Sequence, residues 1–524
     1  MPRADEAVIP PPCRTFDIQT LLFLLAAAIF LYAFLFVPPF IPIDYNIDGL
    51  TLVTDGKRMY EGQMMYRDFF QFMTPGTVLV YFFLFKLFGH RIWIPHLALL
   101  FLGLGLAWLG VVIARKLVRP GLALLPSAIF LAGVYKNRLD PTHHWYSLLT
   151  ALAAIAALVE RRTPARIAAA GFFCGLTAWF TQTRGLAAVM GFCVFLWWES
   201  RQRREGRREW LKQEAWLVGG FLATLIALNA YFVWKAGLAR FLWCTVIFGI
   251  KYYPKTPDNT FGVVTSTVPP FTSLRVFLFN FIPWLFLYGV IPFTHLLFFV
   301  RYRRESGKKP TDFWVRPMLL AIVGSFMFVS VAPSPSLNRM FSNALPGVIL
   351  LIWFIDSPSK VPRALAAGLV AGVLLLVPHA VLSAQSKVRQ IVTTRPGILL
   401  ATDPWEGEVL VWMREHTRPA EYLYAPSSSG AQGVYFYMDL RNPTPLPFIQ
   451  NNGYTPPQQV AEVIHALEQR PVRYILWSTL DLDSIPDWED PSDDHLGPLQ
   501  DYLHAHYKVA KVFRNSDAVW EKKN

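Results

Sequence analysis

Charged residues and cysteines are scarce in this chain of 524 residues. Only 16% of its residues are charged, 53% are hydrophobic, and four are cysteines. Three of the cysteines, Cys174, Cys193 and Cys244, lie in or near apolar segments, and none forms a CxxC pair, so a disulfide framework or a zinc knuckle is not expected. The sequence also lacks a Walker loop, a dinucleotide-binding glycine fingerprint and a nucleophile elbow.

Long apolar runs are what the sequence has instead. Runs of about 18 residues or more can each cross about 30 Å of hydrocarbon, which predicts a polytopic α-helical membrane protein. We expect about eleven transmembrane helices, at residues 18–40, 92–113, 121–136, 145–159, 167–181, 185–198, 216–234, 277–300, 317–332, 343–355 and 363–384. The first run follows a polar leader without a small-residue cleavage site, so it is expected to be a retained anchor.

Positive charge is unevenly distributed, and this predicts an orientation. Residues 395–524 hold 11 basic and 18 acidic side chains, a net charge of −7. Because the whole chain has a net charge of +13, the rest of it carries +20. The basic excess is expected to mark cytoplasmic loops and lipid head groups rather than nucleic acid. The basic clusters begin at Ala114, Glu160, Glu199, Arg301 and Ser359. With these loops inside, the N-terminus is cytoplasmic and the C-terminus lies outside.

Two segments fall outside this pattern of spans. The apolar stretch 74–89 is short, and a crossing there would invert every later basic loop, so we expect a juxtamembrane or re-entrant helix within an external loop, 41–91. After residues 1–384, the pattern changes to alternating strands and amphipathic helices. Residues 385–524 are therefore expected to form an extracytoplasmic α/β domain.

Three carboxylates stand where the chain leaves the first expected span. Asp44, Asp48 and Asp55 follow the apolar run at once. An ionised group beside a membrane helix costs a few kcal/mol, so its position calls for a reason. The simpler interpretation is that they are solvated loop carboxylates or helix caps.

The sequence around Asp48 resembles a known family. The stretch from Asp48 through GLTLVTDGKRM to the LFG at Leu87 is similar to the first external loop of GT-C glycosyltransferases, which use polyprenyl-phosphate sugars and include protein O-mannosyltransferases and aminoarabinose transferases. The matching elements are Asp48, Met59, Gly62, Pro75 and Leu87-Phe88-Gly89, with MYRDFF at Met65 similar to a bacterial branch. Leu139-Asp140-Pro141 resembles a motif of the second external loop of aminoarabinose transferases. The match departs from the family at Gly49, where many members carry a second carboxylate, and at Thr74, where members can carry a lysine.

The resemblance implies a function and roles for these residues. The chain would be a multi-pass enzyme of the bacterial inner membrane that moves a sugar from a polyprenyl-phosphate donor to a hydroxyl acceptor (a glycolipid, polysaccharide or protein) at the outer face, with inversion. Asp48 would be the base, because desolvation can raise the pKa of a carboxylate toward a useful range. Alternatively, Asp48 would help to bind Mg²⁺ or Mn²⁺, with Asp140 as a second ligand or an acceptor-orienting group. No cofactor is certain.

Further polar residues fall in the expected external loops, each with a structural alternative. His143 and His144 are more typical of interfacial hydrogen bonding than of metal binding, because adjacent side chains diverge on a helix, although His144 could assist a sugar hydroxyl. Gln182 and Arg184 form either a phosphate clamp or a snorkelling anchor. Lys251, Tyr252, Tyr253 and Lys255 form either a gate for the polyprenyl phosphate or an interfacial belt. Arg339 is a further phosphate candidate, and Arg67 and Asp68 are expected to pair and order their loop.

Two rival functions remain open from the sequence. A transporter or flippase for a lipid-linked glycan would also need many helices, although such proteins often show repeated halves. A non-catalytic protein that binds polyprenyl lipids is compatible with the single carboxylate at Asp48-Gly49.

Overall fold

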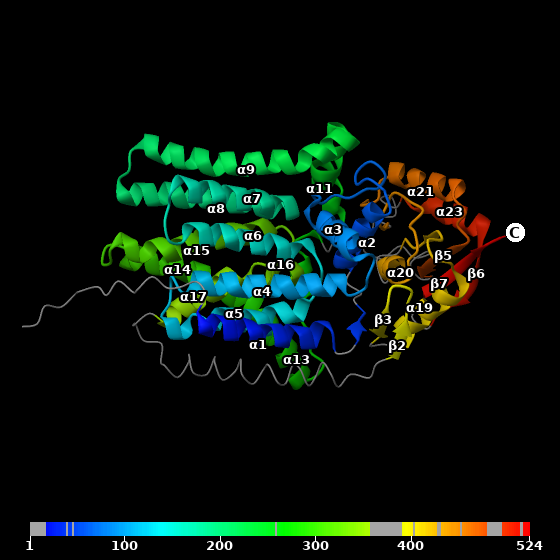
Figure 1. The fold of residues 1–524 in the computed structure, drawn as a ribbon, viewed down its shortest axis with the longest axis horizontal. Coiled ribbons are helices and arrows are strands. Elements are labelled where there is room, and N and C mark those ends of the chain that lie inside the picture. Colours follow the sequence, from blue (N-terminus) through cyan, green and yellow to red (C-terminus); the bar gives the residue numbers. More distant parts are fainter. Residues whose placement is uncertain are drawn as a thin grey trace, which may run out of the picture.

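Most helices of the chain lie side by side in one bundle, and the sheets gather at one end of it (Figure 1). The computed structural model describes residues 17–37, 40–43, 47–256, 259–356, 390–401, 404–426, 431–450, 453–478, 495–513 and 517–523. The bundle comprises α1 (Ile18–Leu35), α4 (Ile94–Ala114), α5 (Leu125–Ile129) with η2 (Phe130–Val134) and η3 (Tyr135–Arg138), α6 (His143–Leu158), α7 (Pro164–Phe180), α8 (Gln182–Arg203), α9 (Arg207–Ala236), α13 (Leu274–Leu285), η7 (Phe286–Val290), α14 (Ile291–Glu305), α15 (Thr311–Val331) and α17 (Ala344–Asp356). Shorter helical pieces join them: η1 (Pro120–Leu122), α10 (Leu238–Leu242), η4 (Trp243–Ile247), α11 (Phe248–Lys251), η5 (Tyr253–Lys255), α12 (Val263–Ser266) and α16 (Leu337–Phe341).

The chain is a polytopic membrane protein. Within the described residues, five helical segments are long and apolar enough to cross a bilayer: Ile18–Leu35, Ile94–Ala114, Arg207–Ala236, Asn280–Glu305 and Thr311–Val331. The first ten spans expected from the sequence all fall on helical segments of the bundle, and the eleventh, 363–384, lies outside the described residues. The number of crossings stays a prediction.

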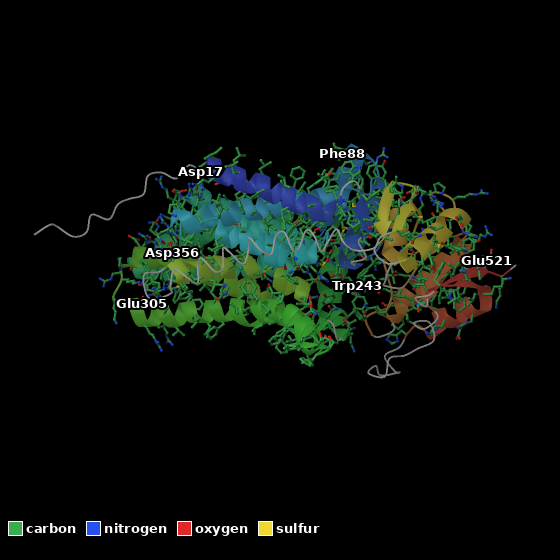
Figure 2. The ribbon with its side chains drawn as sticks, turned by 90° about the horizontal axis from the view of Figure 1, so that it is seen from below. Asp17, Phe88, Trp243, Glu305, Asp356 and Glu521 are labelled. Carbon is green, nitrogen blue, oxygen red and sulfur yellow. The ribbon has the colours of Figure 1, made fainter. Side chains whose placement is uncertain are left out.

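The basic loops meet at the end of the bundle that is farther from the sheets. Asp17, Glu305 and Asp356 lie at that end, and Glu521 lies at the other (Figure 2). Ion pairs tie the loops together there: Arg115 with Asp17 at 2.7 Å, Lys116 with Glu160 at 3.1 Å, Arg162 with Glu199 at 3.0 Å, Arg203 with Asp312 at 3.1 Å, and Arg119 with Asp356. The basic clusters that begin at Ala114, Glu160, Glu199 and Arg301 therefore share one side, as the positive-inside prediction requires.

Small residues bring α7 close to its neighbours in the bundle. A Cβ on Gly175 would lie 2.5 Å from Cβ of Thr224, and a Cβ on Gly220 would lie 2.5 Å from the carbonyl oxygen of Ala168. Close backbone approach of this kind is how helices gain contact in lipid, where no hydrophobic driving force operates between them. The pairing of α7 with α9 fixes one wall of the interior.

Two helices of the expected external loop, α2 (Ile47–Tyr60) and α3 (Gly76–Phe88), lie at the sheet end of the bundle (Figure 1). The hydroxyl of Thr74, just before α3, donates to the carbonyl of Ala178 at 3.0 Å, and that of Tyr81 donates to the carbonyl of Pro141 at 3.0 Å. Near the other end of α3, the ring of Phe85 lies 6.0 Å from that of Phe436. The start of α3 thus contacts the bundle, and its far end contacts α20 of the C-terminal part (Ala431–Tyr437). The expectation that segment 74–89 does not cross the membrane stays a prediction.

The C-terminal part forms two sheets covered by helices. In the first sheet, β1 (Ile41–Pro42) pairs in parallel with β3 (Ile398–Ala401), with Ile41 opposite Leu399, and β3 pairs antiparallel with β2 (Gln390–Thr393). The second sheet has the order β4-β5-β7-β6: β4 (Leu423–Tyr424), β5 (Tyr474–Ser478), β7 (Asp517–Lys522) and β6 (Tyr507–Val512). The helices are α19 (Pro404–His416), α20 (Ala431–Tyr437), α21 (Pro457–Gln469) and α23 (Gly497–His506). We call residues 390–523 the C-terminal assembly.

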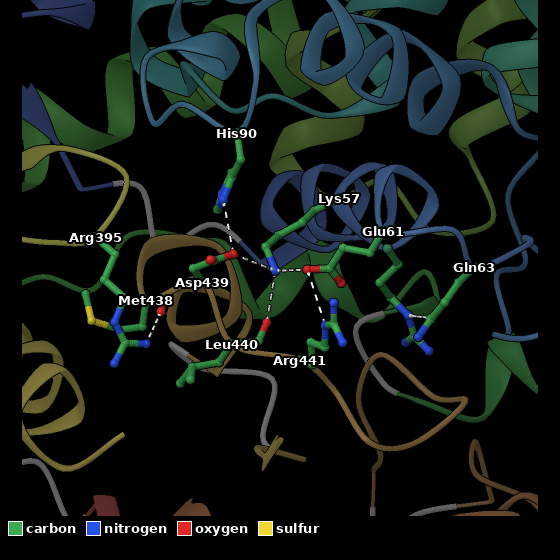
Figure 3. A network of polar contacts seen from close by, with 10 residues as sticks. Lys57, Glu61, Gln63, His90, Arg395, Met438, Asp439, Leu440 and Arg441 are labelled. Atoms are coloured by element: carbon green, nitrogen blue, oxygen red, sulfur yellow. Dashed lines mark hydrogen bonds and ion pairs between the residues drawn. The ribbon is translucent and has the colours of Figure 1, made fainter. Parts of the chain in front are cut away.

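A buried lysine joins α2 to the C-terminal assembly (Figure 3). The ammonium of Lys57 lies 2.6 Å from Oε1 of Glu61 and 3.2 Å from Oδ1 of Asp439, and it donates to the carbonyl of Leu440 at 3.1 Å. Nδ1 of His90 lies 3.4 Å from the same Asp439 oxygen. Burial alone would raise the pKa of Asp439, but the hydrogen bond with His90 and the charge of Lys57 outweigh it and lower the pKa to about 2. The network thus holds a carboxylate ionised at the joint.

We expect Asp439→Asn to destabilise the joint in a pH-dependent way. Because the pKa of Asp439 is lower in the folded chain than its ordinary 3.8, its contribution is complete above about pH 4 and is lost as the pH falls through about 2. The side chain is partly exposed, so solvent screening limits the loss at pH 7 to about 1 kcal/mol. Thermal unfolding of the purified protein between pH 7 and pH 3 measures it. Asp312→Asn, which changes an exposed carboxylate at the far end of the bundle, is the control, and a difference that does not shrink below pH 4 would contradict this account.

Candidate active site

A cavity of about 2060 Å³ lies where the bundle meets α2 and the C-terminal assembly. Its wall includes seven of the residues singled out from the sequence: Asp48, His143, His144, Gln182, Arg184, Tyr253 and Arg339. Its lining also includes exposed apolar side chains: Leu186, Leu222, Ile226, Trp234, Val246 and Ile250. The cavity therefore combines polar groups with a large exposed apolar surface.

Asp48 is the carboxylate at the centre of the site. It lies in the first turn of α2, where the helix dipole favours negative charge, and its side chain is exposed to the cavity while protein surrounds it. The loss of bulk water raises the pKa of Asp48. The positive charges of Arg339 and Arg138 and a side-chain hydrogen bond from Asn338 lower the pKa, but by less. A carboxylate with these surroundings can accept a proton from a ligand in the cavity.

Arg184 places a buried positive charge in the wall of the cavity. Its side chain is 1% exposed; NH1 donates to the carbonyl of His144 at 2.8 Å and to the Ser147 hydroxyl, and NH2 donates to the Ser342 hydroxyl at 2.7 Å. Its Nε has no hydrogen-bond partner, and no carboxylate pairs with it among the residues that the structure describes. A buried guanidinium costs several kcal/mol in desolvation unless an anion compensates it, so this position favours an anionic ligand.

Arg339, on the short helix α16, supplies a second guanidinium. It donates to the carbonyl of Ser334 at 2.7 Å, to Oδ1 of Asn259 at 3.2 Å and to the hydroxyl of Tyr253. Within the described ranges it forms no ion pair with a carboxylate other than its electrostatic interaction with Asp48. Arg339 thus ties the segment after α11 to the same wall that carries Asp48.

The two histidines differ from the expectation that their side chains diverge. Their ring centroids are 4.0 Å apart, because both lie in the first turn of α6, after its N-cap Thr142. Nδ1 of His143 is 2.7 Å from the hydroxyl of Thr181. Nδ1 of His144 has no hydrogen-bond partner in the described part of the chain, and the residue lines the cavity. His144 can therefore offer a ring nitrogen to a ligand.

Asp140 lies beside Asp48, behind the cavity wall. It is 3% exposed and does not line the cavity, yet a Cβ on Gly49 would overlap Oδ1 of Asp140 and lie 2.6 Å from Cδ of Pro141. The carboxylate of Asp140 fills the space beside Gly49, and it fits there because residue 49 has no side chain.

Other expected residues lie elsewhere. Arg67 and Asp68 form an exposed bidentate pair at 2.7 and 2.8 Å, as expected for a loop-ordering role, and neither lines the cavity. Lys251, Tyr252 and Lys255 are not part of its lining either, and the ammonium of Lys251 lies 5.2 Å from the centroid of the Tyr252 ring.

Of the other two acidic residues of the opening segment, the structure describes only Asp55. Asp44 lies outside the described residues. Asp55 is buried in α2 and accepts a hydrogen bond from Nε2 of Gln71 at 2.7 Å. Burial raises the pKa of Asp55 to about 7, despite the charge of Arg58 and the bond from Gln71. It holds a cavity-lining side chain in place and does not itself reach the cavity.

Gln182 orders a neighbouring loop. It opens α8, and its Nε2 donates to the carbonyl of Phe72 at 2.9 Å. Three partners of the site were not identified from the sequence: Asn338 and Arg138 beside Asp48, and Asn259 beside Arg339. Only the position of Asn338 next to Arg339 could have drawn attention to it. Among the described residues, no group of three or more His, Cys, Asp or Glu side chains could hold a metal ion, so the structure defines no ligand set for a divalent metal.

The architecture is that of the GT-C fold, which defines a class of polytopic membrane proteins. Two crystal structures share it over 96% of this chain and 97% of theirs: ArnT from Cupriavidus metallidurans bound to undecaprenyl phosphate, and the same protein in the apo state. Each has a TM-score of 0.56 and 11% sequence identity. No protein-family model and no curated protein matches the chain. The resemblance expected from short motifs is therefore confirmed at the level of the fold.

We expect Gly49→Ala to disturb the site although it adds one methyl group. The new Cβ would displace the Asp140 side chain and meet the rigid ring of Pro141, whereas Gly219→Ala places its methyl group in open space on α9 and serves as the matched control. Overpacking of this kind costs about 1–3 kcal/mol. Thermal unfolding of the two variants measures the difference, and equal unfolding temperatures would show that Asp140 does not pack against α2.

Proposed function

We propose that this chain is a membrane glycosyltransferase that moves a sugar from a polyprenyl-phosphate donor to a hydroxyl acceptor. One observation carries the proposal: a single cavity, with exposed apolar side chains in its lining, holds Asp48 together with Arg184 and Arg339. This transfer needs two elements: a carboxylate that can take a proton, and guanidinium groups that can hold a phosphate. The shared fold with a protein crystallised with undecaprenyl phosphate supports the same donor class.

The reaction follows from the positions of these groups. The acceptor hydroxyl gives its proton to the Asp48 carboxylate while its oxygen bonds to the anomeric carbon. The bond from that carbon to the phosphate oxygen breaks, and its electron pair stays on the phosphate, where Arg184 and Arg339 stabilise the added charge. Attack from the side opposite the phosphate inverts the anomeric centre. The free Nδ1 of His144 is suited to a hydroxyl of the donor sugar.

The apolar side of the cavity suits the lipid of the donor. Leu222, Ile226 and Trp234 on α9 and Ile250 on α11 line the cavity and are exposed. A prenyl chain could lie along them in contact with the bilayer while its phosphate reaches the two arginines. With the basic loops in the cytoplasm, this site lies at the outer face of a bacterial inner membrane, together with the C-terminal assembly.

A flippase is the main rival, and the position of the charges argues against it. The charged residues of the cavity lie at one end of the bundle, at the starts of α6 and α8 and in α2 and α16. A transport path would require polar groups along the full depth of the membrane.

We expect Asp48→Asn to abolish sugar transfer while undecaprenyl phosphate still binds. The amide keeps the shape of the side chain but cannot accept the proton, so the transfer rate should fall at least about 100-fold. In the unchanged protein, the rate should fall at acidic pH, as the raised pKa of Asp48 allows it to become protonated. Release of radiolabelled sugar from an undecaprenyl-phosphate donor measures the rate.

The same variant separates the rival functions. A flippase would keep lipid translocation in proteoliposomes when Asp48 is changed, and a lipid-binding protein without catalysis would show no transfer even before the change. Sugar transfer that continues undiminished in Asp48→Asn would remove Asp48 as the base.

We expect Arg184→Met to weaken phosphate binding without unfolding the protein. The substitution removes a buried charge that lacks a carboxylate partner, so the unfolding temperature without ligand should be unchanged or higher. A lost charge-assisted bond is worth about 1.5–3 kcal/mol, or about 10- to 100-fold in the Kd for undecaprenyl phosphate. Arg201→Met, an exposed arginine near the other end of α8, is the control. Equal affinity in both variants would remove Arg184 from the phosphate site.

A further inference from the structure

One wall of the cavity comes from the C-terminal assembly, and the residues of this wall that the structure describes carry no charge. They are Phe448, Ile449, Gln450, Tyr454, Trp477 and Leu496. Asp48, Arg184 and Arg339 belong to the rest of the lining. The two regions of one cavity therefore differ in chemistry, and an anionic donor accounts for only the charged region.

The uncharged wall continues into a small side pocket of about 20 Å³. Both spaces are lined by Phe448, Tyr454 and Thr51, whereas Gln459 lines only the side pocket. This volume suits one water molecule or one hydroxyl group. We call the uncharged wall and this side pocket together the aromatic–amide subsite.

Three polar atoms in this subsite have no hydrogen-bond partner among the described residues. They are Oγ1 of Thr51, Oε1 of Gln450 and Nε2 of Gln459, each of which is shielded from solvent. Thr51 and Gln459 are 5% and 4% exposed. Buried polar groups are nearly always satisfied by protein, water or ligand, so a donor and acceptor set of this kind points to a ligand rich in hydroxyl groups.

Aromatic rings beside these atoms bring the subsite close to Asp48. The rings of Phe448 and Tyr454 stack with centroids 5.8 Å apart and planes at 22°, and the Tyr253 ring lies 6.5 Å from that of Tyr454. The pKa of Tyr454 is raised by burial, by Tyr253 and by the negative charge of Asp48. The phenol of Tyr454 is therefore close enough to the Asp48 carboxylate to interact with its charge. A molecule bound here would stand next to the proposed base.

We propose that the aromatic–amide subsite binds the acceptor, and that the acceptor is a neutral saccharide. Aromatic faces cover the C–H faces of a sugar ring, and neutral amide and hydroxyl groups exchange hydrogen bonds with its hydroxyls. A phosphorylated acceptor or a charged peptide would find no counter-ion among the described residues of this wall and would lose solvation on entry. The inference rests on the proposed function and selects one acceptor class for it.

Saturation-transfer NMR on the purified full chain tests the proposal. The probes are methyl glycosides of glucose, galactose and mannose, with glucose 6-phosphate and a neutral serine hexapeptide as competing classes. The detergent is an amine oxide, because a maltoside would itself be a saccharide. At least one methyl glycoside should receive saturation, and Gln450→Leu and Gln459→Leu should each lower that signal at least threefold. Gln458→Leu, which changes the exposed neighbour of Gln459, should leave it unaltered.

Two results would overturn the proposal. One is saturation of glucose 6-phosphate or of the peptide equal to or above that of every methyl glycoside. The other is a glycoside signal that is absent, or that is as strong in both variants as in the unchanged protein. Binding of undecaprenyl phosphate, followed by thermal shift on the same samples, is an independent readout. If the unchanged protein binds the lipid but gives no saccharide signal, only the acceptor inference is wrong. If the unchanged protein does not bind the lipid, the proposed function is wrong.

Discussion

Uncompensated positive charge in a largely apolar interior is the constraint on which this structure depends. The guanidinium of Arg184 is held by two hydroxyls and a carbonyl, with no described carboxylate beside it. Neutral partners only partly repay the desolvation of a cation, so the protein retains affinity for an anion at this point. Asp48, in the wall of the same cavity, accepts a hydrogen bond from Asn338 and interacts electrostatically with Arg339 and Arg138. One cavity therefore brings a carboxylate together with the guanidinium groups of Arg184 and Arg339.

The C-terminal assembly is part of the site and not an appendage to the bundle. Strand β1, which follows the first helix, adds to the sheet of β2 and β3, and the Lys57 network joins α2 to the turn at Asp439. Through these contacts, the helix that carries Asp48 and the loop that carries Tyr454 keep a common position. The wall of one cavity thus contains both Asp48 and Phe448, which are about 400 positions apart in the sequence.

Much of the architecture could be predicted because it follows from local composition. Apolar runs predicted the helices of the bundle, and clusters of arginine and lysine predicted which of their ends lie together, as the ion pairs between Arg162 and Glu199 and between Arg203 and Asp312 show. Asp48, Arg184 and Arg339 were identified because charged residues beside membrane helices need a reason. The close approach of the His143 and His144 rings, 4.0 Å between centroids, was not predicted, because side-chain torsions are not set by helical spacing.

The sequence by itself determined that the chain enters a membrane, in which stretches most helices of the bundle lie, and which charged residues stand near their ends. These properties depend on neighbours along the chain. Only the tertiary structure decided that Asn338 bonds to Asp48, that Asp140 fills the space left open at Gly49, and that Gln450 and Gln459 line two adjoining spaces. Contacts of this kind join segments separated by tens to hundreds of residues, and no local pattern records which of them the packing will bring together.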